Sequence, residues 1–225
     1  MSLLAIIPAR GGSKGIPRKN IKDFCGKPLI AWTIQEALES KYVDRVIVST
    51  DDKEIKNISL KFGAEVPFLR PKELSRDNSQ GIDVMLHAIN IFSNFERIVY
   101  LQPTSPFRTV IDIDSAYEFA LDKDADSLVP IVKSDKNVHW FLSRDSDSKV
   151  KRIMNSGFSS NRQNLPDAFL LCGSIFLYKT EWLSSNRKLM SKNSYGFEIP
   201  SERAYEIDTT QDWDFAEYLM SKKMK

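Results

Sequence analysis

The sequence predicts an α/β fold built on an open, mostly parallel sheet. Apolar runs with the composition of buried strands occur at residues 3–8, 45–49 and 97–101. Between them lie segments whose apolar residues recur at helical spacing, such as residues 29–38 and 82–92. Strands that alternate with helices indicate βαβ units. The chain has 225 residues, which is enough for one such domain with a full core.

Helix starts are marked by residues that suit a first turn or a cap. Proline is accepted at the first helical position, and Ser, Thr and Asp accept hydrogen bonds from exposed backbone N–H groups. The expected starts are at Pro28, Thr50 with Asp51, Thr109 with Asp112, and Thr209 with Asp212.

Further extended segments are expected at residues 64–69, 127–132, 172–178 and 205–208. Residues 133–171 are polar, contain Trp140, Phe141 and Phe158, and show no long helical pattern. We therefore predict a single domain over residues 1–225, with a β-rich excursion at about 133–171 that serves as a dimerisation arm.

Composition excludes several classes of function. A formal net charge of +2 gives no global reason to bind nucleic acid or a membrane surface. Two cysteines and two histidines are too few and too scattered for a structural zinc cluster or a disulfide framework. No apolar run approaches the roughly 20 residues that span a bilayer, and no signal peptide is recognisable. We expect a cytoplasmic protein.

The connection after the first strand, residues 9–20, is the most informative segment. Connections of this kind usually take about 2–6 residues. Three glycines, Gly11, Gly12 and Gly15, let the backbone approach a ligand, and ligands lie beyond the carboxyl ends of parallel strands. Residues 10–27 carry one acid, Asp23, against six cations: Arg10, Lys14, Arg18, Lys19, Lys22 and Lys27. The segment predicts a polyphosphate site.

Neither of two familiar phosphate motifs fits this loop. Lys14 is followed by Gly15 rather than by Ser or Thr, and the glycine spacing differs from the dinucleotide fingerprint. The alternative is a solvated basic loop whose glycines serve turn geometry alone.

Glu206 and Asp208 are expected at another strand end. Alternation along an extended chain places both carboxylates on one side. Such a pair suits Mg²⁺, which is commonly held by one or two carboxylates together with substrate phosphates. The alternative is that Asp208 is only an acid at a helix start.

Other polar residues carry weaker signals. Asp51 and Asp52 favour helix capping over a functional role, and Arg108 suits either loop support or an anion. Arg162 suits a partner carboxylate or plain exposure. His87 is expected to be a satisfied core residue, and no histidine is placed to act as general base or to activate Cys25 or Cys172.

The sequence resembles the cytidylyltransferases that act on N-acylneuraminate and related nonulosonates. Ile6 to Asn20 has the pattern of their signature, and the runs that begin at Val48, Leu69, Leu101 and Ile207 follow in the expected order. The resemblance implies a Rossmann-like sheet of the nucleotidyltransferase type and a homodimer. It also implies a reaction in which CTP and a nine-carbon 2-keto acid sugar give the CMP-sugar and pyrophosphate, with Mg²⁺ as cofactor.

The resemblance also assigns roles to residues. Those implied in catalysis are Arg10, Lys19, Gln102 and Asp208. Those implied in nucleotide binding are Ala9, Arg10, Gly11, Gly12, Ser13, Lys14, Lys19, Asn20, Arg70, Asp77 and Ser79. Those implied in sugar binding are Gln102, Thr104, Ser105, Arg162 and Phe176, and those implied in metal binding are Asp208 and Glu206.

Departures from the family pattern leave the sugar open. Glu206, Cys172 and Phe176 stand where Asp, Asn and Tyr are common, and a sugar-associated Lys has no clear counterpart near Trp140. Neuraminate, legionaminate and pseudaminate all remain candidates. The other hypotheses are a nucleotidyltransferase for an eight-carbon keto acid or a sugar-1-phosphate, and a nucleotide-binding module without catalysis.

Overall fold

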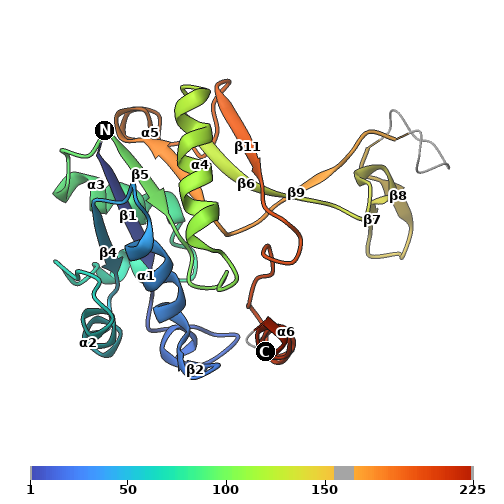
Figure 1. Cartoon of the computed structure of the whole chain (residues 1–225). Coiled ribbons are helices and arrows are strands. Elements are labelled where there is room, and N and C mark those ends of the chain that lie inside the picture. Colours follow the sequence, from blue (N-terminus) through green and yellow to red (C-terminus); the bar gives the residue numbers. More distant parts are fainter. Residues whose placement is uncertain (1, 155–164, 224–225) are drawn as a thin grey trace.

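The computed structural model describes residues 2–154 and 165–223, and its centre is a seven-stranded sheet (Figure 1). The strand order is β11-β6-β10-β5-β1-β4, and β9 pairs with β6. Five strands run in one direction and are opposed by β10 and β9, so the predicted α/β class with a mostly parallel sheet is confirmed. The strands are β1 (Leu3–Pro8), β4 (Arg45–Ser49), β5 (Arg97–Tyr100), β6 (Ser127–Lys133), β9 (Phe169–Leu171), β10 (Phe176–Lys179) and β11 (Ser194–Glu198).

Helices cover both faces of the sheet. Leu3, Ala5 and Ile7 point to the face covered by α1 (Leu29–Glu39), α2 (Lys53–Lys61) and α4 (Val110–Asp122). Leu4 and Ile6 point to the face covered by α3 (Gly81–Ile91) and α5 (Thr180–Asn186). A strand buried on both sides needs apolar residues at every position, which explains the unbroken run in β1.

The carboxyl-terminal helix, α6 (Thr210–Lys223), packs through Trp213, Ala216 and Met220 on a separate small core with Phe24. Phe24 belongs to a short hairpin of β2 (Asp23–Phe24) and β3 (Lys27–Pro28), which follows the 3-10 turn η1 (Lys19–Ile21). Within residues 2–154 and 165–223, no helix is long and apolar enough to cross a membrane.

Three predicted strands are shorter or absent. Residues 64–69 make only isolated bridges, Ile47 with Glu65 and Thr50 with Leu69. The strand expected at 172–178 begins at Phe176 and runs antiparallel, because β9 and β10 pair with β6 in the same direction and residues 172–175 are the irregular break between them. Residues 205–208 pair with no strand, and the unpredicted β11 lies at the sheet edge instead.

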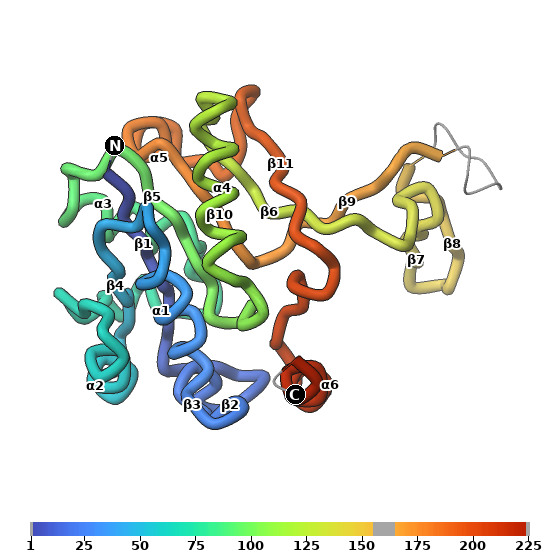
Figure 2. Tube along the Cα trace, viewed as in Figure 1, coloured from blue at the N-terminus to red at the C-terminus, as the bar shows by residue number. Residues whose placement is uncertain are grey.

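The region predicted as an excursion leaves the sheet and returns to it (Figure 2). After the 3-10 turn η3 (Val138–Trp140), β7 (Leu142–Arg144) and β8 (Val150–Arg152) form a hairpin that projects from the body. β9 then pairs with β6. We call residues 134–154 the arm. Its apolar side chains are largely exposed, among them Phe141, Leu142, Val150 and Ile153.

Candidate functional site

A cavity of about 430 Å³ lies at the carboxyl ends of β1 and β5. Its lining carries five cations against two carboxylates, Asp77 and Asp208. The cations are Arg10, Lys14, Lys19, Arg70 and Arg76. A surplus of positive charge in a concave site attracts anions, and polyphosphates above all.

The glycine-rich loop is fixed to the start of α2. The Asp51 carboxylate accepts a hydrogen bond from the N–H of Gly11 at 3.0 Å, and Arg18 donates to Asp52 at 2.5 and 3.1 Å. Of the residues predicted to cap α2, Asp52 does so by accepting from the N–H groups of Glu54 and Ile55, whereas Thr50 and Asp51 do not. The Arg18 guanidinium lowers the pKa of Asp52 to about 2, so this anchor stays charged.

The loop glycines provide space rather than turn geometry, because none of the three lies at positive φ. A Cβ on Gly11 would come 2.7 Å from Asp52 Oδ2, and a Cβ on Gly15 would come 2.4 Å from the main-chain oxygen of Asp208. Gly12 has nothing within 4 Å. Gly15 therefore permits a close backbone approach between two segments that lie almost 200 residues apart.

The predicted cations divide into two groups. Arg10 and Lys14 reach the cavity and form ion pairs with Asp77 at 2.8 and 2.5 Å. Lys19 donates to the Ile207 carbonyl at 2.7 Å and pairs with Asp208 at 3.0 Å. The other three support the fold, because Arg18 holds α2 while Lys22 and Lys27 lie over the rings of Trp213 and Trp32.

Buried polar side chains hold the loop and the next wall of the cavity. Asn20 is buried and donates to the carbonyl of Arg10 at 3.1 Å. Arg70 is also buried, and burial lowers the pKa of its guanidinium. Its Nε donates to Ser75 Oγ at 3.0 Å in the 3-10 turn η2 (Lys72–Ser75). An arginine inside the cavity wall is a preorganised donor for an anion.

The segment after β5 forms the opposite wall. Thr104 and Gln102 line the cavity, and the Thr104 carbonyl accepts from the N–H of Ile207 at 2.8 Å. Arg108 is buried and donates to the Ser174 carbonyl at 2.5 Å and to Thr33 Oγ1 at 2.7 Å. Of the two alternatives for Arg108, these contacts support its role in holding the loop.

Glu206 lies behind this wall. Its carboxylate accepts a hydrogen bond from the N–H of Gly173, and a Cβ on Gly173 would come 2.8 Å from Gln102 Oε1 and 3.1 Å from Glu206 Oε2. Burial raises the pKa of Glu206, an effect that the Gly173 N–H opposes and the charge of Asp208 reinforces. Gln102, Glu206 and Asp208 therefore converge on one side of the cavity.

These carboxylates fit a metal that the substrate helps to bind. Within the part of the chain that the structure describes, no three His, Cys, Asp or Glu side chains form a complete metal cluster. Mg²⁺ typically takes one or two carboxylates and completes its shell with phosphate oxygens and water. Asp208 lines the cationic cavity and Glu206 lies behind its wall within reach of the Asp208 charge, so the two carboxylates match that donor set.

Most predicted site residues line the cavity. These are Arg10, Ser13, Lys14, Lys19, Asn20, Arg70, Asp77, Ser79, Gln102, Thr104 and Asp208. Ala9 and Ser105 are buried and do not line it, so direct contact with a ligand is not supported for them. Gly11, Gly12 and Glu206 are also outside the lining, Phe176 lines an adjoining chamber, and Arg162 lies outside the described residues.

Sequence reasoning missed two polar lining residues, Arg76 and Tyr100. Arg76 stands next to Asp77, yet no spacing rule distinguishes it from a surface cation. Tyr100 ends a strand predicted only as core. Burial raises the pKa of its hydroxyl to about 12, so it remains a protonated donor.

The remaining titratable candidates do not supply a nucleophile or a base. Burial raises the pKa of the Cys172 thiol to about 11, and it also raises the pKa of Cys25. His87 packs edge-on against Phe68, and burial lowers its pKa. Its Nδ1 is buried without a hydrogen-bond partner among the described residues, so the prediction of a satisfied core histidine was wrong in that respect.

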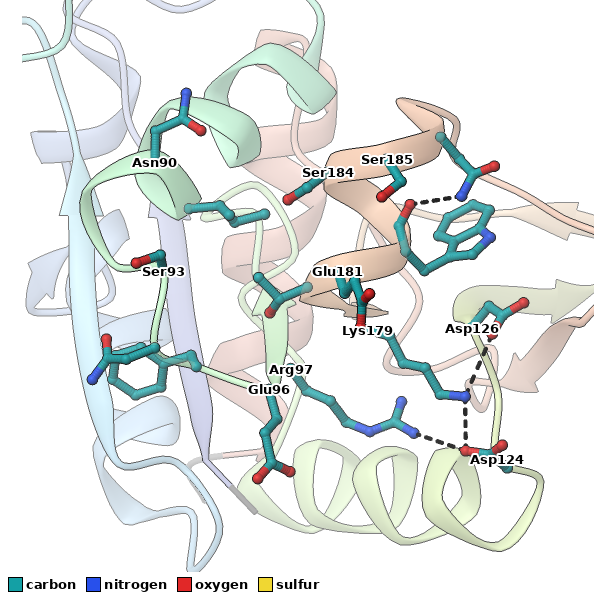
Figure 3. A pocket seen from close by; sticks show the side chains of 16 residues that line it. Asn90, Ser93, Glu96, Arg97, Asp124, Asp126, Lys179, Glu181, Ser184 and Ser185 are labelled. Carbon is teal, nitrogen blue, oxygen red and sulfur yellow. Dashed lines mark hydrogen bonds and ion pairs between the residues drawn. The ribbon is translucent and has the colours of Figure 1, made fainter.

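A larger groove of about 960 Å³ lies at the other end of the sheet (Figure 3). Its cations are already neutralised. Lys179 pairs with Asp124 at 2.8 Å and with Asp126 at 3.4 Å, while Arg97 approaches Asp124 at 3.8 Å. With two cations and four carboxylates in its lining, this groove does not attract a polyphosphate.

The chain has close relatives among curated proteins. It is 34% identical to the pseudaminic acid cytidylyltransferase of Campylobacter jejuni, over 97% of this chain and 96% of that protein. It is also 34% identical to the CMP-N,N'-diacetyllegionaminic acid synthase of Legionella pneumophila, over 98% and 97%. Identity to the N-acylneuraminate cytidylyltransferase of Escherichia coli is 31%, over 98% of this chain and 52% of that protein.

The fold is also found in solved structures. That of CMP:2-keto-3-deoxy-manno-octonic acid synthetase complexed with CTP superposes with a TM-score of 0.77 at 18% identity, covering 99% of this chain and 100% of that one. Residues 4–223 match the family model described as cytidylyltransferase. The predicted resemblance is thus confirmed, and the chain belongs to the cytidylyltransferase family and is a nucleotidyltransferase.

Proposed function

We propose that this enzyme transfers CMP from CTP to the anomeric hydroxyl of a nine-carbon 2-keto acid sugar and releases pyrophosphate. The relatives named for pseudaminic, diacetyllegionaminic and N-acylneuraminic acids have similar identities to this chain, which supports the nonulosonate class without choosing among its members. A nucleoside triphosphate as co-substrate also favours action in the cytoplasm.

The observation that carries this proposal is the convergence of unbalanced cations with Gln102 and Asp208 around one cavity. Arg10, Lys14 and Lys19 bind the triphosphate and stabilise the charge that develops on it. The anomeric oxygen forms a bond to the α-phosphorus, and the α–β phosphoanhydride bond breaks. Its electron pair leaves with pyrophosphate, and the hydroxyl proton is released.

The opposite wall orients the sugar. Gln102 and Thr104 offer neutral donors and acceptors to its hydroxyl groups, and Arg108 keeps their segment in place from behind. Holding the attacking oxygen in line with the α-phosphorus contributes to the rate through orientation. Arg162 remains a predicted partner for the sugar carboxylate.

Asp208 and Glu206 would hold Mg²⁺ together with the phosphates. A bound Mg²⁺ supplies Lewis-acid stabilisation of the phosphoryl oxygens. Glu206 is suited to this role in its ionised form, although burial favours the neutral carboxyl in the protein alone. Lys19, which pairs with Asp208 at 3.0 Å, would keep this carboxylate directed at the cavity.

We also propose a homodimer that forms through the arm. A two-stranded hairpin is marginally stable alone, and this one exposes Leu142, Val150 and Ile153 at 53%, 60% and 58%. A second copy would cover these side chains. Ile153→Glu should convert the dimer to a monomer in light scattering, whereas Ile111→Glu, on the exposed surface of α4, should not. A wild-type monomer would exclude the proposal.

The decisive experiment for the reaction measures pyrophosphate release with the four nucleoside triphosphates, Mg²⁺ and a panel of keto-acid sugars. We expect release only with CTP and a nine-carbon 2-keto acid, and its loss in Asp208→Ala. Activity with a sugar-1-phosphate would instead identify another nucleotidyltransferase. CTP binding without turnover, unchanged in Asp208→Ala, would identify a binding module.

A further inference from the structure

The segment that carries Asp208 has no regular structure of its own. Residues 204–208 belong to neither a helix nor a strand, although Asp208 lines the cationic cavity. Ile207 is tied to two walls of that cavity, because its N–H donates to the Thr104 carbonyl at 2.8 Å and its carbonyl accepts from Lys19 Nζ at 2.7 Å. The position of the Asp208 carboxylate therefore depends on contacts with other elements.

The first turn of α6 supplies a contact to the main chain of Asp208. Asp212 Oδ2 accepts from the N–H of Asp208 at 3.1 Å, and from the N–H and the hydroxyl of Thr209 at 2.7 and 2.9 Å. Its other oxygen, Oδ1, accepts from the Tyr205 hydroxyl at 3.3 Å. Asp212 thus holds the chain on both sides of Asp208, and hydrogen bonds to an ionised acceptor are among the stronger ones.

An apolar core fixes α6 against the same cavity walls. Trp213, the neighbour of Asp212, is buried and meets Phe24 edge to face with ring centroids 5.3 Å apart. Three further members of this core, from the glycine-rich loop, the segment after β5 and the Asp208 segment, are Ile16, Phe107 and Ile207. Since close-packed cores yield little, Asp212 is mounted on an element whose place relative to the cavity is fixed.

We propose that Asp212 is a positioning residue for the reaction, which fixes Asp208 where its carboxylate meets the metal and the phosphates. This inference rests on the proposed function. A helix cap alone explains the bonds between Asp212 and Thr209, because a capping box joins these two positions. The bond to the Asp208 N–H goes beyond such a box.

The box at the start of α4 shows the contrast. There the Asp112 carboxylate accepts from the N–H and the hydroxyl of Thr109, both at 2.9 Å, and it also pairs with Arg203 at 2.9 Å. The same local motif thus stabilises a helix at one place and is joined to a site carboxylate at the other.

The test compares Asp212→Ala with Thr109→Ala, which weakens the box on α4 outside the cavity lining. In both variants Tm should fall by about 2–4 °C, the effect of losing one helix cap. Only Asp212→Ala should lower kcat, by about tenfold, because a small misplacement of a reacting group is costly. Its KM for CTP should change by less than about twofold. Asp212→Asn, whose amide oxygen can still accept from the Asp208 N–H, should recover most of the lost rate.

Hydrogen exchange measured by NMR on the ligand-free protein tests the positioning apart from the chemistry. The Asp208 amide should exchange about tenfold faster in Asp212→Ala than in the wild type, the effect of losing one hydrogen bond to a charged acceptor. In Thr109→Ala it should exchange at the wild-type rate.

An unchanged exchange rate or an unchanged kcat in Asp212→Ala would overturn the positioning role and leave Asp212 a helix cap. An equal loss of kcat in Thr109→Ala would overturn it too. No pyrophosphate release from wild-type enzyme with CTP and any keto acid would instead overturn the proposed function, and the exchange result would still report whether Asp212 holds Asp208.

Discussion

The two ends of the sheet carry cavities of opposite character. The larger, about 960 Å³, lies at the amino end of β5 and contains two cations and four carboxylates. The smaller, about 430 Å³, lies at the carboxyl ends of β1 and β5 and contains five cations and two carboxylates. An excess of positive charge therefore distinguishes the proposed substrate site, and size does not.

The difference follows from the way each end is built. At the amino end, Lys179 and Arg97 stand beside Asp124, which ends the turn after α4. At the carboxyl end, a long loop brings several cations to a place where two strands stop and no equal number of acids is present. A groove whose cations are all matched by acids is part of the fold, whereas a cavity whose cations outnumber its acids attracts an anionic ligand.

The largest expected effect is that of Arg10→Ala. Removing one charged contact to the transition state costs about 3–4 kcal/mol, so kcat should fall by about 10²–10³. Steady-state pyrophosphate release with CTP and the preferred sugar measures it.

Lys179→Ala is the control at the other end of the sheet. It removes an ion pair with Asp124 but touches nothing in the cationic cavity, so kcat should remain close to that of the wild type. If both variants lost activity equally, the distinction between the two cavities would be wrong.

Local sequence patterns explain how far the fold could be predicted. The first strand is recognisable because both faces are buried, and the capping box at Thr109 and Asp112 is present as predicted. Residues 205–208 look extended for a different reason. They follow the cavity wall, where Ile207 is buried and its N–H bonds to Thr104 instead of to a strand.

The site was harder to predict in detail because its geometry depends on contacts between distant segments. That three of six loop cations support the fold could be learned only from the positions of Asp52, Trp213 and Trp32. The contact of Glu206 with Gly173 likewise joins residues whose proximity no periodic pattern encodes.

The next largest effect should come from Gly15→Ala. A Cβ there would lie 2.4 Å from the main-chain oxygen of Asp208, and a backbone atom cannot move aside as a flexible side chain can. The loop and the Asp208 segment must separate, and a misplacement of about 1 Å can cost about 10²-fold in rate. We expect kcat to fall about 10- to 100-fold.

Gly12→Ala is the matched control within the same loop, since a Cβ on Gly12 meets nothing within 4 Å. Its kcat should stay near the wild-type value. Equal losses in the two variants would show that the loop needs flexible glycines rather than the close approach at Gly15.

Glu206→Gln should separate the effect of Glu206 on the stability of the protein from its effect on catalysis. Because burial raises the folded-state pKa of Glu206, the folded protein binds more protons than the unfolded chain between the ordinary pKa of 4.5 and the raised value. The free energy of unfolding therefore falls as pH rises through this window. Replacing Glu206 by glutamine removes that loss of stability, and the amide oxygen still accepts a hydrogen bond from the Gly173 N–H.

Thermal unfolding with EDTA measures the effect. At pH 8 the Tm of Glu206→Gln should be up to a few degrees above that of the wild type, and the difference should vanish below about pH 4. The concentration of Mg²⁺ needed for half-maximal turnover should rise. A variant that is less stable at pH 8 would show that the Glu206 charge stabilises the fold.

The smallest effect concerns Asp77, whose carboxylate forms ion pairs with both Arg10 and Lys14. These cations lower the pKa of Asp77, so its carboxylate stays charged and competes with phosphate for them. These pairs are open to solvent, and such exposed pairs contribute little net stability. Asp77→Asn should therefore bind CTP up to about fivefold more tightly in calorimetry.

The direction of this change tests what Asp77 does. If its side chain contacts the nucleotide directly, as the sequence predicted, the asparagine variant would bind CTP more weakly. Asp122→Asn removes a comparable exposed ion pair, with Lys123 at 2.8 Å, outside the cavity lining and should leave the affinity unchanged. Tighter binding in Asp77→Asn alone would mean that the Asp77 carboxylate pairs with Arg10 and Lys14 in the free protein and that the triphosphate displaces it from them.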